Sequence, residues 1–434
     1  MSQSFNTIVE KLYAAKSGQQ KFERMQRITK PLLKELQEVS FVHIAGTNGK
    51  GSTSAFLDRL LLDHGFSVGL FTSPHLYSVT ERLKYNDEQI TESDFVTLYE
   101  KTYRMIAECF PNDLDNLGFF EWLTVMNFVF LTEMRPDVAI LEVGIGGLRD
   151  STNVIDPDVT IITTVGLDHQ KMLGNTIDEI AMQKAGIIKS RKPVYVGRMP
   201  EDALYTVEMT AQAYNAPVYL LDREFKVKNV TDVDSGLTSF DFINAQANSH
   251  YHLTCPLIGR YQVDNLALAL ACFEYLMAKK HHHVLEKRLP EILMHTSWPG
   301  RFEKVSTYPV TYIDSAHNVA AVAHLMLTVT QNPAFKSKSI VLVFSALTRK
   351  NYAEMLDFLR QKYPEYPIAL TSFDDSHSLT KYLVTKWLQP NNVTFYPSIK
   401  AVLSKYRETD TQLICFGSIY FISEVRLALV GPTI

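Results

Sequence analysis

Cysteine is scarce in this chain, and so are long apolar runs and charge of one sign. Four cysteines occur in 434 residues without metal-ligand spacing, so we expect reduced, buried thiols in a cytoplasmic protein. The longest apolar stretch, 123–131, includes Thr124 and Asn127 and is too short to span a bilayer. A net charge of −4 offers no general attraction to nucleic acid or an anionic membrane. The start lacks a basic end followed by an apolar core, so we do not expect secretion.

The overall composition is that of a globular protein, with 46% hydrophobic and 21% charged residues. A chain of this length exceeds one ordinary core and predicts two domains. The turn formers of 295–300 interrupt the periodic pattern. We therefore expect a domain boundary there, between a domain of 1–296 and one of 297–434.

The apolar pattern predicts an α/β fold. The segments 137–143 and 159–165 are almost continuously apolar, which is typical of strands buried on both faces of a parallel sheet. The more irregular stretch 225–257 predicts a small antiparallel appendage. The capping-box pattern at 176–179 predicts a helix that runs to about residue 189. From residue 309 onward, strands and helices alternate again, with strands expected at 368–371, 393–396 and 412–416, which predicts a second, smaller Rossmann-like domain.

The strongest local signal is a glycine-rich turn between a strand and a helix. An apolar run at 42–45 leads into Gly46-Thr47-Asn48-Gly49-Lys50-Gly51-Ser52-Thr53 and then into an apolar helix. Glycines let successive N–H groups point inward, and the helix N-terminus adds positive charge, so this turn suits a phosphate. Lys50 would reach the terminal phosphates, and Ser52 or Thr53 could offer a hydroxyl to Mg²⁺. The alternative is a glycine turn of a metabolite-binding domain.

Polar residues at the expected strand ends are further site candidates, because ligands of open α/β sheets bind there. They are Ser73, Glu142, His169 and, in the second domain, Asp314. Glu142 could hold Mg²⁺ directly or through water. His169 could bind a metal ion, or it could equally cap a helix or pack against neighbouring side chains.

Lys184 shares an otherwise apolar helix face with Ile180 and Ile188. Desolvation would favour the neutral amine, which can react with carbon dioxide to give a metal-binding carbamate. From the residues alone we favour a lysine that snorkels to water.

The chain resembles the folylpolyglutamate synthase and dihydrofolate synthase family of the Mur ligase superfamily along nearly its whole length. The resemblance begins at 46–52 and continues through Thr72-Ser73-Pro74-His75-Leu76, Glu142-Val143-Gly144-Ile145-Gly146-Gly147, Asp150-Ser151-Thr152-Asn153, Leu167-Asp168-His169-Gln170, Lys184-Ala185-Gly186, Gly259-Arg260-Tyr261-Gln262 with Asn265, Trp298-Pro299-Gly300-Arg301, Asp314-Ser315-Ala316-His317-Asn318 and Gly417-Ser418-Ile419-Tyr420.

The resemblance implies a Mur-ligase-type ATPase domain followed by a Rossmann-like domain, and an ATP-dependent amide ligase that works as a monomer. ATP and Mg²⁺ are the implied cofactors, and L-glutamate and a folate or pteroate are the implied substrates. The implied nucleotide contacts are Asn48, Gly49, Lys50, Gly51, Ser52, Asn265 for adenine, Arg301 for a phosphate across the domain cleft, and Asp314 for ribose. Ser73, Glu142 and His169 are implied metal ligands. Lys184 matches the carbamylated lysine of the family, which reverses the preference for snorkelling.

The folate end is implied near Phe120, Glu121, Arg149, Asp150 and Ser151, and His317 would help to place the incoming glutamate. The sequence departs from the family pattern in three places: 345–351 keeps only the lysine of an Asp-Lys-Asp group, Leu148-Arg149 inverts the usual order, and Val319 replaces a proline.

The resemblance favours glutamate addition to the γ-carboxylate of tetrahydrofolate, and Gln170 is similar to family members limited to that reaction. The alternatives are a bifunctional enzyme that also makes dihydrofolate, a diverged paralogue, a cell-wall precursor ligase and a nucleotide-dependent switch. A cell-wall ligase would need an additional domain before residue 42, and a switch would not need Arg301 and Asp314.

Overall fold

The computed structural model describes residues 4–19, 21–233, 235–336, 338–388 and 392–431. Residues 1–3, part of the start interpreted above as lacking a secretory leader, lie outside them. The chain forms two compact units. One consists of Met1–Lys228, Asp241–Leu253 and Asp264–Thr296, and the other of Asn229–Phe240, Thr254–Val263 and Ser297–Ile434. The boundary expected after residue 296 stays a prediction.

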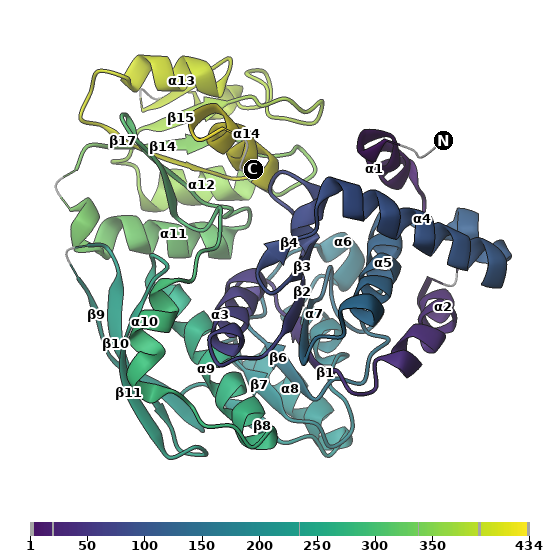
Figure 1. Ribbon diagram of the computed structural model, residues 1–434. Helices are drawn as coiled ribbons and strands as arrows, with labels where there is room; N and C mark the ends of the chain where they lie inside the picture. The colour runs from purple at the N-terminus through teal and green to yellow at the C-terminus, as the bar shows by residue number, and fades with distance from the viewer. Residues whose placement is uncertain (1–3, 20, 234, 337, 389–391, 432–434) are drawn as a thin grey trace. The chain divides into compact units, whose positions relative to one another are not determined.

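The first unit is built on an eight-stranded sheet of mostly parallel strands (Figure 1). The two edge strands on one side pair antiparallel, and all other neighbours pair parallel. The order is β4 (Glu88–Gln89), β3 (Leu83–Tyr85), β2 (Val68–Phe71), β5 (Val138–Glu142), β1 (Ser40–Ala45), β6 (Val159–Ile162), β7 (Val194–Val196) and β8 (Val218–Leu220).

Helices cover both faces of this sheet. They are α1 (Phe5–Ala14), α2 (Lys21–Glu35), α3 (Lys50–Leu62), α4 (Glu92–Cys109), α5 (Phe119–Met134), α6 (Gln170–Leu173), α7 (Ile177–Ala185), α8 (Glu201–Ala213), α9 (Arg260–Lys279) and α10 (Leu289–Met294). The His64 ring, just past the end of α3, lies 4.6 Å from the Phe273 ring of α9. Because both faces of the sheet are covered, β1, β5 and β6 are buried along their whole length and are mostly apolar.

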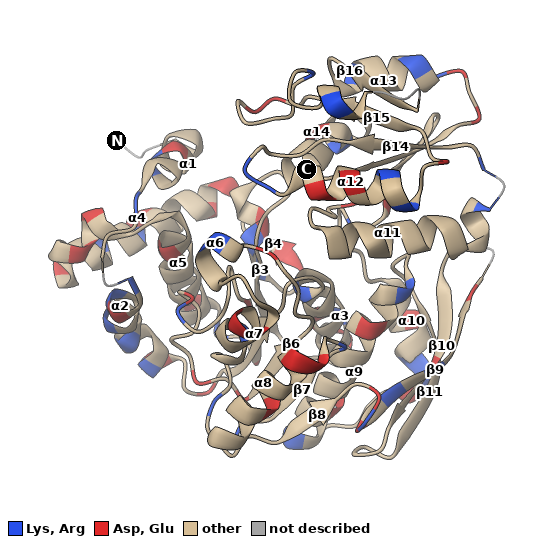
Figure 2. Ribbon diagram, turned by 180° about the vertical axis from the view of Figure 1, so that it is seen from behind, with Lys and Arg blue, Asp and Glu red and all other residues tan. Residues whose placement is uncertain are grey.

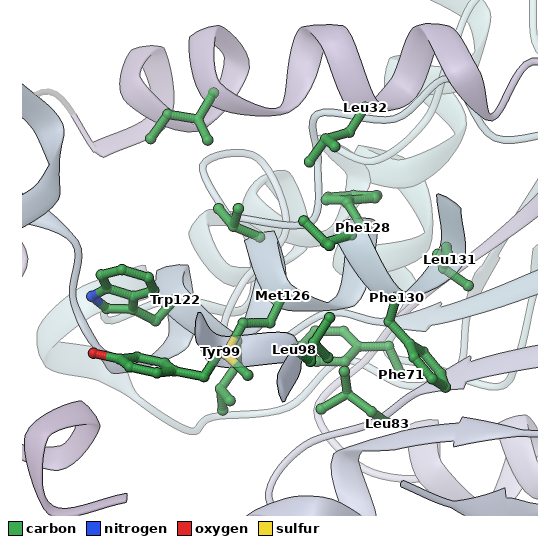
Figure 3. Close-up of a cluster of buried hydrophobic side chains, with 14 of the residues drawn as sticks. Leu32, Phe71, Leu83, Leu98, Tyr99, Trp122, Met126, Phe128, Phe130 and Leu131 are labelled. Atoms are coloured by element: carbon green, nitrogen blue, oxygen red, sulfur yellow. The ribbon is translucent and has the colours of Figure 1, made fainter. Parts of the chain in front are cut away.

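One large core cluster joins α1, α2, α4 and α5 to the sheet. Figure 3 shows Leu98 and Tyr99 of α4 beside Trp122 and Met126 of α5, with Phe71 from β2 close by. A smaller cluster packs α7 and α8 against β6 and β7. Burial of these side chains supplies the main driving force for folding of the unit.

A three-stranded sheet follows, in the order β11 (Ser249–Cys255), β10 (Thr238–Asn244) and β9 (Phe225–Asp232). The short connections between consecutive strands allow only antiparallel neighbours. Burial alternates strictly along β10, as expected for a sheet with one covered face.

The second unit contains a six-stranded sheet, parallel except for its first pair. The order is β12 (Glu303–Thr307), β13 (Val310–Ile313), β17 (Gln412–Phe416), β14 (Ile340–Phe344), β15 (Ile368–Thr371) and β16 (Val393–Tyr396). The helices of this unit are α11 (Val319–Gln331), α12 (Tyr352–Lys362), α13 (Ile399–Tyr406) and α14 (Ile419–Leu429). Figure 2 shows Lys and Arg interspersed with Asp and Glu on the helices of both units.

The structure confirms the predicted α/β class with two mainly parallel sheets. One expectation is wrong: Cys109, the last residue of α4, is exposed because it lies beyond Ile106, the last buried residue of the helix, whereas Cys255, Cys272 and Cys415 are buried. All four thiols are free.

Candidate functional site

The glycine turn connects β1 to α3, and its tight fit requires glycine. A Cβ on Gly46 would lie 1.8 Å from Thr163 Oγ1. Gly49 has φ +90°, and a Cβ there would lie 2.3 Å from Asn265 Oδ1. Both positions therefore exclude a side chain, and the turn is pressed between the end of β6 and the side of α9.

Two threonines that follow β6 fasten the turn. The Thr47 N–H donates to Thr164 O at 2.8 Å, and the Asn48 N–H donates to Thr164 Oγ1 at 3.0 Å. Thr163 Oγ1 donates to Asn48 O at 2.6 Å. The sequence analysis missed both threonines, although polar residues at the carboxyl end of a buried strand are a signal for a site.

The start of α3 presents the phosphate-binding groups. Its first N–H groups have no intrahelical acceptor, which leaves them available to an anion. Ser52 and Thr53 are buried, and Thr53 Oγ1 has no hydrogen-bond partner. An unsatisfied buried hydroxyl is what a site for a phosphate or a hard cation requires.

Lys50, Ser73 and Glu142 come together at the carboxyl edge of the sheet. Lys50 Nζ donates to Gly46 O at 3.1 Å and lies 3.8 Å from Glu142 Oε1. Glu142 Oε2 accepts the Ser73 N–H at 3.1 Å. In the sheet, β5 lies next to β1, and β2 lies next to β5. The carboxyl ends of β2 and β5 therefore bring Ser73 and Glu142 to the phosphate turn.

Lys184 is buried on α7, with 3% of the side chain exposed. Burial, together with the charge of Lys50, lowers its pKa to about 7, and Asp168 opposes the shift. The helix is fixed at its start by a capping box in which Thr176 and Glu179 satisfy each other's backbone N–H groups. Lys184 does not snorkel to water, and near pH 7 a large fraction of its amine is neutral.

His169 stands at the start of α6 with left-handed backbone, φ +50°, and its N–H donates to Asp168 Oδ1 at 2.8 Å. Its ring lies 3.9 Å from the same carboxylate. Within the described ranges, no group of three or more His, Cys, Asp or Glu side chains could hold a metal ion by itself. The assignment of His169 as a metal ligand stays a prediction.

Three residues expected at the folate end are buried, and two of them hold the chain in place. Glu121 pairs with Arg24 at 2.7 Å and accepts the Gly118 N–H at 2.9 Å. Asp150 accepts the N–H groups of Ile145 and Thr152 and the Thr152 hydroxyl. Ser151 is fully buried.

The other two residues expected at the folate end are Arg149 and Phe120. Arg149 is exposed, and the Phe120 ring stacks 5.8 Å from that of Phe71. Next to it, Phe119 stacks on Tyr13 at 4.6 Å, and the Arg82 guanidinium lies 5.3 Å from the same ring. These side chains form an aromatic and cationic group that the sequence analysis did not anticipate.

A network behind the turn was also missed. His43 of β1 contacts Thr152 Oγ1 at 2.8 Å, and burial, helped by Lys189, lowers its pKa to about 3. Asn153 donates to the carbonyls of Leu148 and Gly186 at 3.0 Å each. The loop after β5 is thereby tied to the end of α7, directly behind Lys184.

In the second unit, Asp314 and Arg301 are neighbours. Asp314 is buried at the end of β13 and accepts the Phe302 and Ala316 N–H groups at 2.9 and 2.8 Å. Burial raises its pKa, while Arg301 opposes the shift. His317 Nδ1 donates to Ser315 O at 2.8 Å, which leaves Nε2 as the acceptor nitrogen of a neutral ring.

No helix in the described residues is both long and apolar enough to cross a membrane.

Comparison with known proteins identifies this arrangement. The Mur ligase middle domain model matches residues 44–273. The dihydrofolate synthase/folylpolyglutamate synthase of Bacillus subtilis is 33% identical over 416 residues, which cover 94% of each chain. The apo form of L. casei FPGS superposes with a TM-score of 0.86 at 28% identity, covering 99% of this chain and 100% of that one. An FPGS–AMPPCP–folate complex gives a TM-score of 0.84 at 28% identity with the same coverage.

A phosphate turn on a mostly parallel sheet, followed by a second α/β unit, is therefore the architecture of a Mur ligase. Within that class, the chain belongs to the folylpolyglutamate synthase and dihydrofolate synthase family.

Proposed function

We propose that this protein is an ATP-dependent ligase that adds L-glutamate to the γ-carboxylate of tetrahydrofolate. The observation that carries the proposal is the convergence of Lys50, Glu142 and the buried Lys184 at the phosphate turn, in a chain that matches its family over nearly its whole length. The relatives named above include a structure with an ATP analogue and folate.

The chemistry begins with a carboxylate, which is a poor acyl donor. Transfer of the γ-phosphoryl group to it gives an acyl phosphate with a good leaving group. The glutamate amine then attacks the acyl carbon, and the tetrahedral intermediate expels phosphate. The protein's part is mostly to position the reactants and to stabilise charge. Asn48, Gly49, Gly51 and Ser52 hold the triphosphate, and Lys50 stabilises the charge on the phosphoryl group in transfer.

The residues at the turn fit a magnesium ion. Ser73 and Glu142 supply oxygen ligands, the chemistry that Mg²⁺ prefers, and His169 is the third ligand that the family resemblance implies. When bound, Mg²⁺ neutralises phosphate charge. The backbone N–H of Ser73 holds the Glu142 carboxylate in one orientation, so the site is preorganised by the chain itself.

Lys184 is proposed to carry a carbamate. Its lowered pKa supports this, because only the neutral amine attacks carbon dioxide. The product would be an anion facing Lys50, which replaces repulsion between two cations by attraction.

The second unit is proposed to grip the rest of the nucleotide and the amino acid. Arg301 contacts a phosphate, Asp314 the ribose and His317 the incoming glutamate, while Asn265 of the first unit contacts adenine. The proximity of Arg301 to Asp314 supports a shared task. For the folate, Phe120 and Arg149 offer contact surface, Glu121 and Asp150 hold the surrounding chain, and Ser151 is buried beside Asp150. We further propose that the protein is cytoplasmic, which its free thiols support, and that it works as a monomer.

A second candidate activity is the formation of dihydrofolate from dihydropteroate. It is favoured by the Bacillus subtilis relative, whose name carries both activities.

One assay tests these proposals: purified protein with ATP, Mg²⁺, glutamate and either tetrahydrofolate or dihydropteroate. We expect ADP release that needs both glutamate and the folate, with a product heavier by one glutamyl unit. Turnover of dihydropteroate would establish the second activity. ATP hydrolysis that needs neither glutamate nor a folate would instead indicate a nucleotide switch and overturn the ligase proposal.

A further inference from the structure

Arg198 lies just beyond β7 and connects three elements of the first unit. Its Nε and Nη2 donate to the two oxygens of Asp222 at 2.7 and 2.9 Å, and its Nη1 donates to Asp264. Asp222 follows β8, and Asp264 belongs to α9. The guanidinium therefore ties the ends of two strands to the N-terminal part of one helix.

The backbone holds Arg198 at this place. The Gly197 N–H donates to Ile162 O at 2.9 Å, and a Cβ on Gly197 would lie 2.2 Å from Thr163 O. The chain before Arg198 thus lies directly against the end of β6, whose threonines fasten the phosphate turn. Asp222 has φ +77°, and its N–H donates to Phe225 O at 2.7 Å, so the acceptor is also fixed.

The partner on α9 leads back to the phosphate turn. Asp264 precedes Asn265, whose side chain fills the space that a Cβ on Gly49 would need. A shift of this part of α9 would move the Asn265 amide relative to the turn. The contacts form a chain from Arg198 through Asp264 and Asn265 to Gly49.

We propose that Arg198 is a positioning residue for nucleotide binding. By holding Asp264, it fixes the α9 backbone so that the Asn265 amide stands beside the phosphate turn and selects adenine by hydrogen bonds. This inference rests on the proposed use of ATP. Arg198 acts through the helix and does not itself take part in phosphoryl transfer.

The exposure of the cluster makes the inference testable. The side chains of Arg198, Asp222 and Asp264 are 46%, 51% and 28% exposed. Ion pairs this exposed contribute little to folding, so removal of the guanidinium should leave the unit folded. Arg223 offers a matched control: it is 51% exposed and also binds two carboxylates, of Glu208 and Glu224, but neither belongs to α9.

The experiment compares Arg198→Ala, Arg198→Lys and Arg223→Ala with the wild type, by calorimetric titration with ATP and GTP and by steady-state kinetics. For Arg198→Ala we expect the Kd and KM for ATP to rise about two- to fivefold, the change that the small energy of exposed ion pairs allows, and the preference for ATP over GTP to fall. The kcat and the KM for glutamate and folate should stay near wild type. Arg198→Lys should be intermediate, because lysine cannot bridge both carboxylates. Arg223→Ala should behave as the wild type.

Three outcomes decide against the inference. Equal ATP affinity in Arg198→Ala and Arg223→Ala overturns it, and so does a parallel change in kcat and every KM, which would indicate general structural damage. Should Arg198→Ala fail to fold, Asp264→Asn, which leaves the Arg198–Asp222 pair intact, must weaken ATP binding in its place. Failure of the wild type to bind ATP would overturn the proposed function as well, whereas wild-type binding with unaffected variants overturns only the role of Arg198.

Discussion

At the scale of single residues, two of the buried ionisable groups with shifted pKa values can be tested directly. Lys184 belongs to the candidate site, and Asp58 lies on α3 behind it. In both cases burial is the main cause of the pKa shift, because the charged form loses hydration that the surroundings do not replace. Each shift gives a measurable dependence on pH or on a ligand.

For Lys184 we expect activity to depend on dissolved carbon dioxide. Enzyme freed of carbon dioxide should lose most of its activity and recover it on addition of bicarbonate, faster as the pH rises through about 7, because the neutral amine becomes more abundant. Intact-mass measurement should show one added carbon dioxide. Full activity of Lys184→Ala without any such adduct would return Lys184 to a structural role.

For Asp58 we expect an effect on stability. Burial raises its pKa to about 7, with Asp87 adding to the shift and Lys84 and Arg59 opposing it. A raised pKa contributes stability that is complete below the unfolded value of 3.8 and is lost as the pH rises to about 7. The difference of about three pKa units corresponds to about 4 kcal/mol.

Asp58→Asn, which cannot ionise, should therefore be more stable than the wild type above pH 7, by about 2–4 kcal/mol in the free energy of unfolding measured with urea. Below pH 4 the two proteins should differ little. The control is Asp63→Asn, which alters the partly exposed pair with Arg59 on the same helix. A constant difference between wild type and Asp58→Asn from pH 4 to 8 would contradict the assignment.

Lys50 gives the sharpest test of the phosphate turn. Because Lys50 Nζ contacts only loop and carboxylate oxygens, Lys50→Ala should fold normally. Its kcat should fall by about 10²–10³, as for the loss of one preorganised group that stabilises the transition state. Circular dichroism checks the fold, and wild-type turnover would refute the assigned role.

At the scale of elements, Gly49 can be tested against Gly65. Both have a φ near +90°, but a Cβ on Gly65 would meet nothing within 4 Å, whereas one on Gly49 would collide with Asn265. Both alanine variants should lose about 1–2 kcal/mol of stability from backbone strain. Only Gly49→Ala should also weaken ATP binding, by at least about tenfold, because the turn must move. Equal ATP affinity in the two variants would show that the crowding at Gly49 is unimportant.

The same scale explains how far the sequence predicts the structure. The bounds of β15, β16 and β17 are those expected from the sequence, because each strand consists mostly of apolar and β-branched residues. By contrast, β3, β4 and β12 were missed, since they are short or largely exposed edge strands. The helix expected to reach residue 189 ends at Ala185, where Leu148 packs against Gly186. That end depends on a contact between distant segments.

The residues of the candidate site likewise fall into those that the local sequence predicts and those that it does not. The glycine turn and Glu142 were predictable from local pattern, since each stands where an apolar strand stops. Arg301 and Asn265 could be assigned only through the family resemblance. Thr163 and Arg198 were not foreseen, because their roles arise from the order of strands in the sheet, which no short motif encodes.

At the scale of the whole molecule, ligand binding should stabilise the fold. A nucleotide that binds only the folded protein adds about 2.7 kcal/mol at about one hundred times its Kd. We therefore expect a non-hydrolysable ATP analogue with Mg²⁺ to raise the thermal midpoint of the wild type and to raise that of Gly49→Ala less. Calorimetric scans at several concentrations provide the measurement. A midpoint that is indifferent to nucleotide would argue against the site.

The hydrogen bond from Lys50 to the Gly46 carbonyl has a consequence for the first moments of catalysis. The ammonium already rests on an oxygen of its own loop, so an arriving phosphate exchanges one oxygen partner for another. The ammonium group therefore keeps an oxygen partner throughout, and the free-energy cost of desolvating it before the reaction is small.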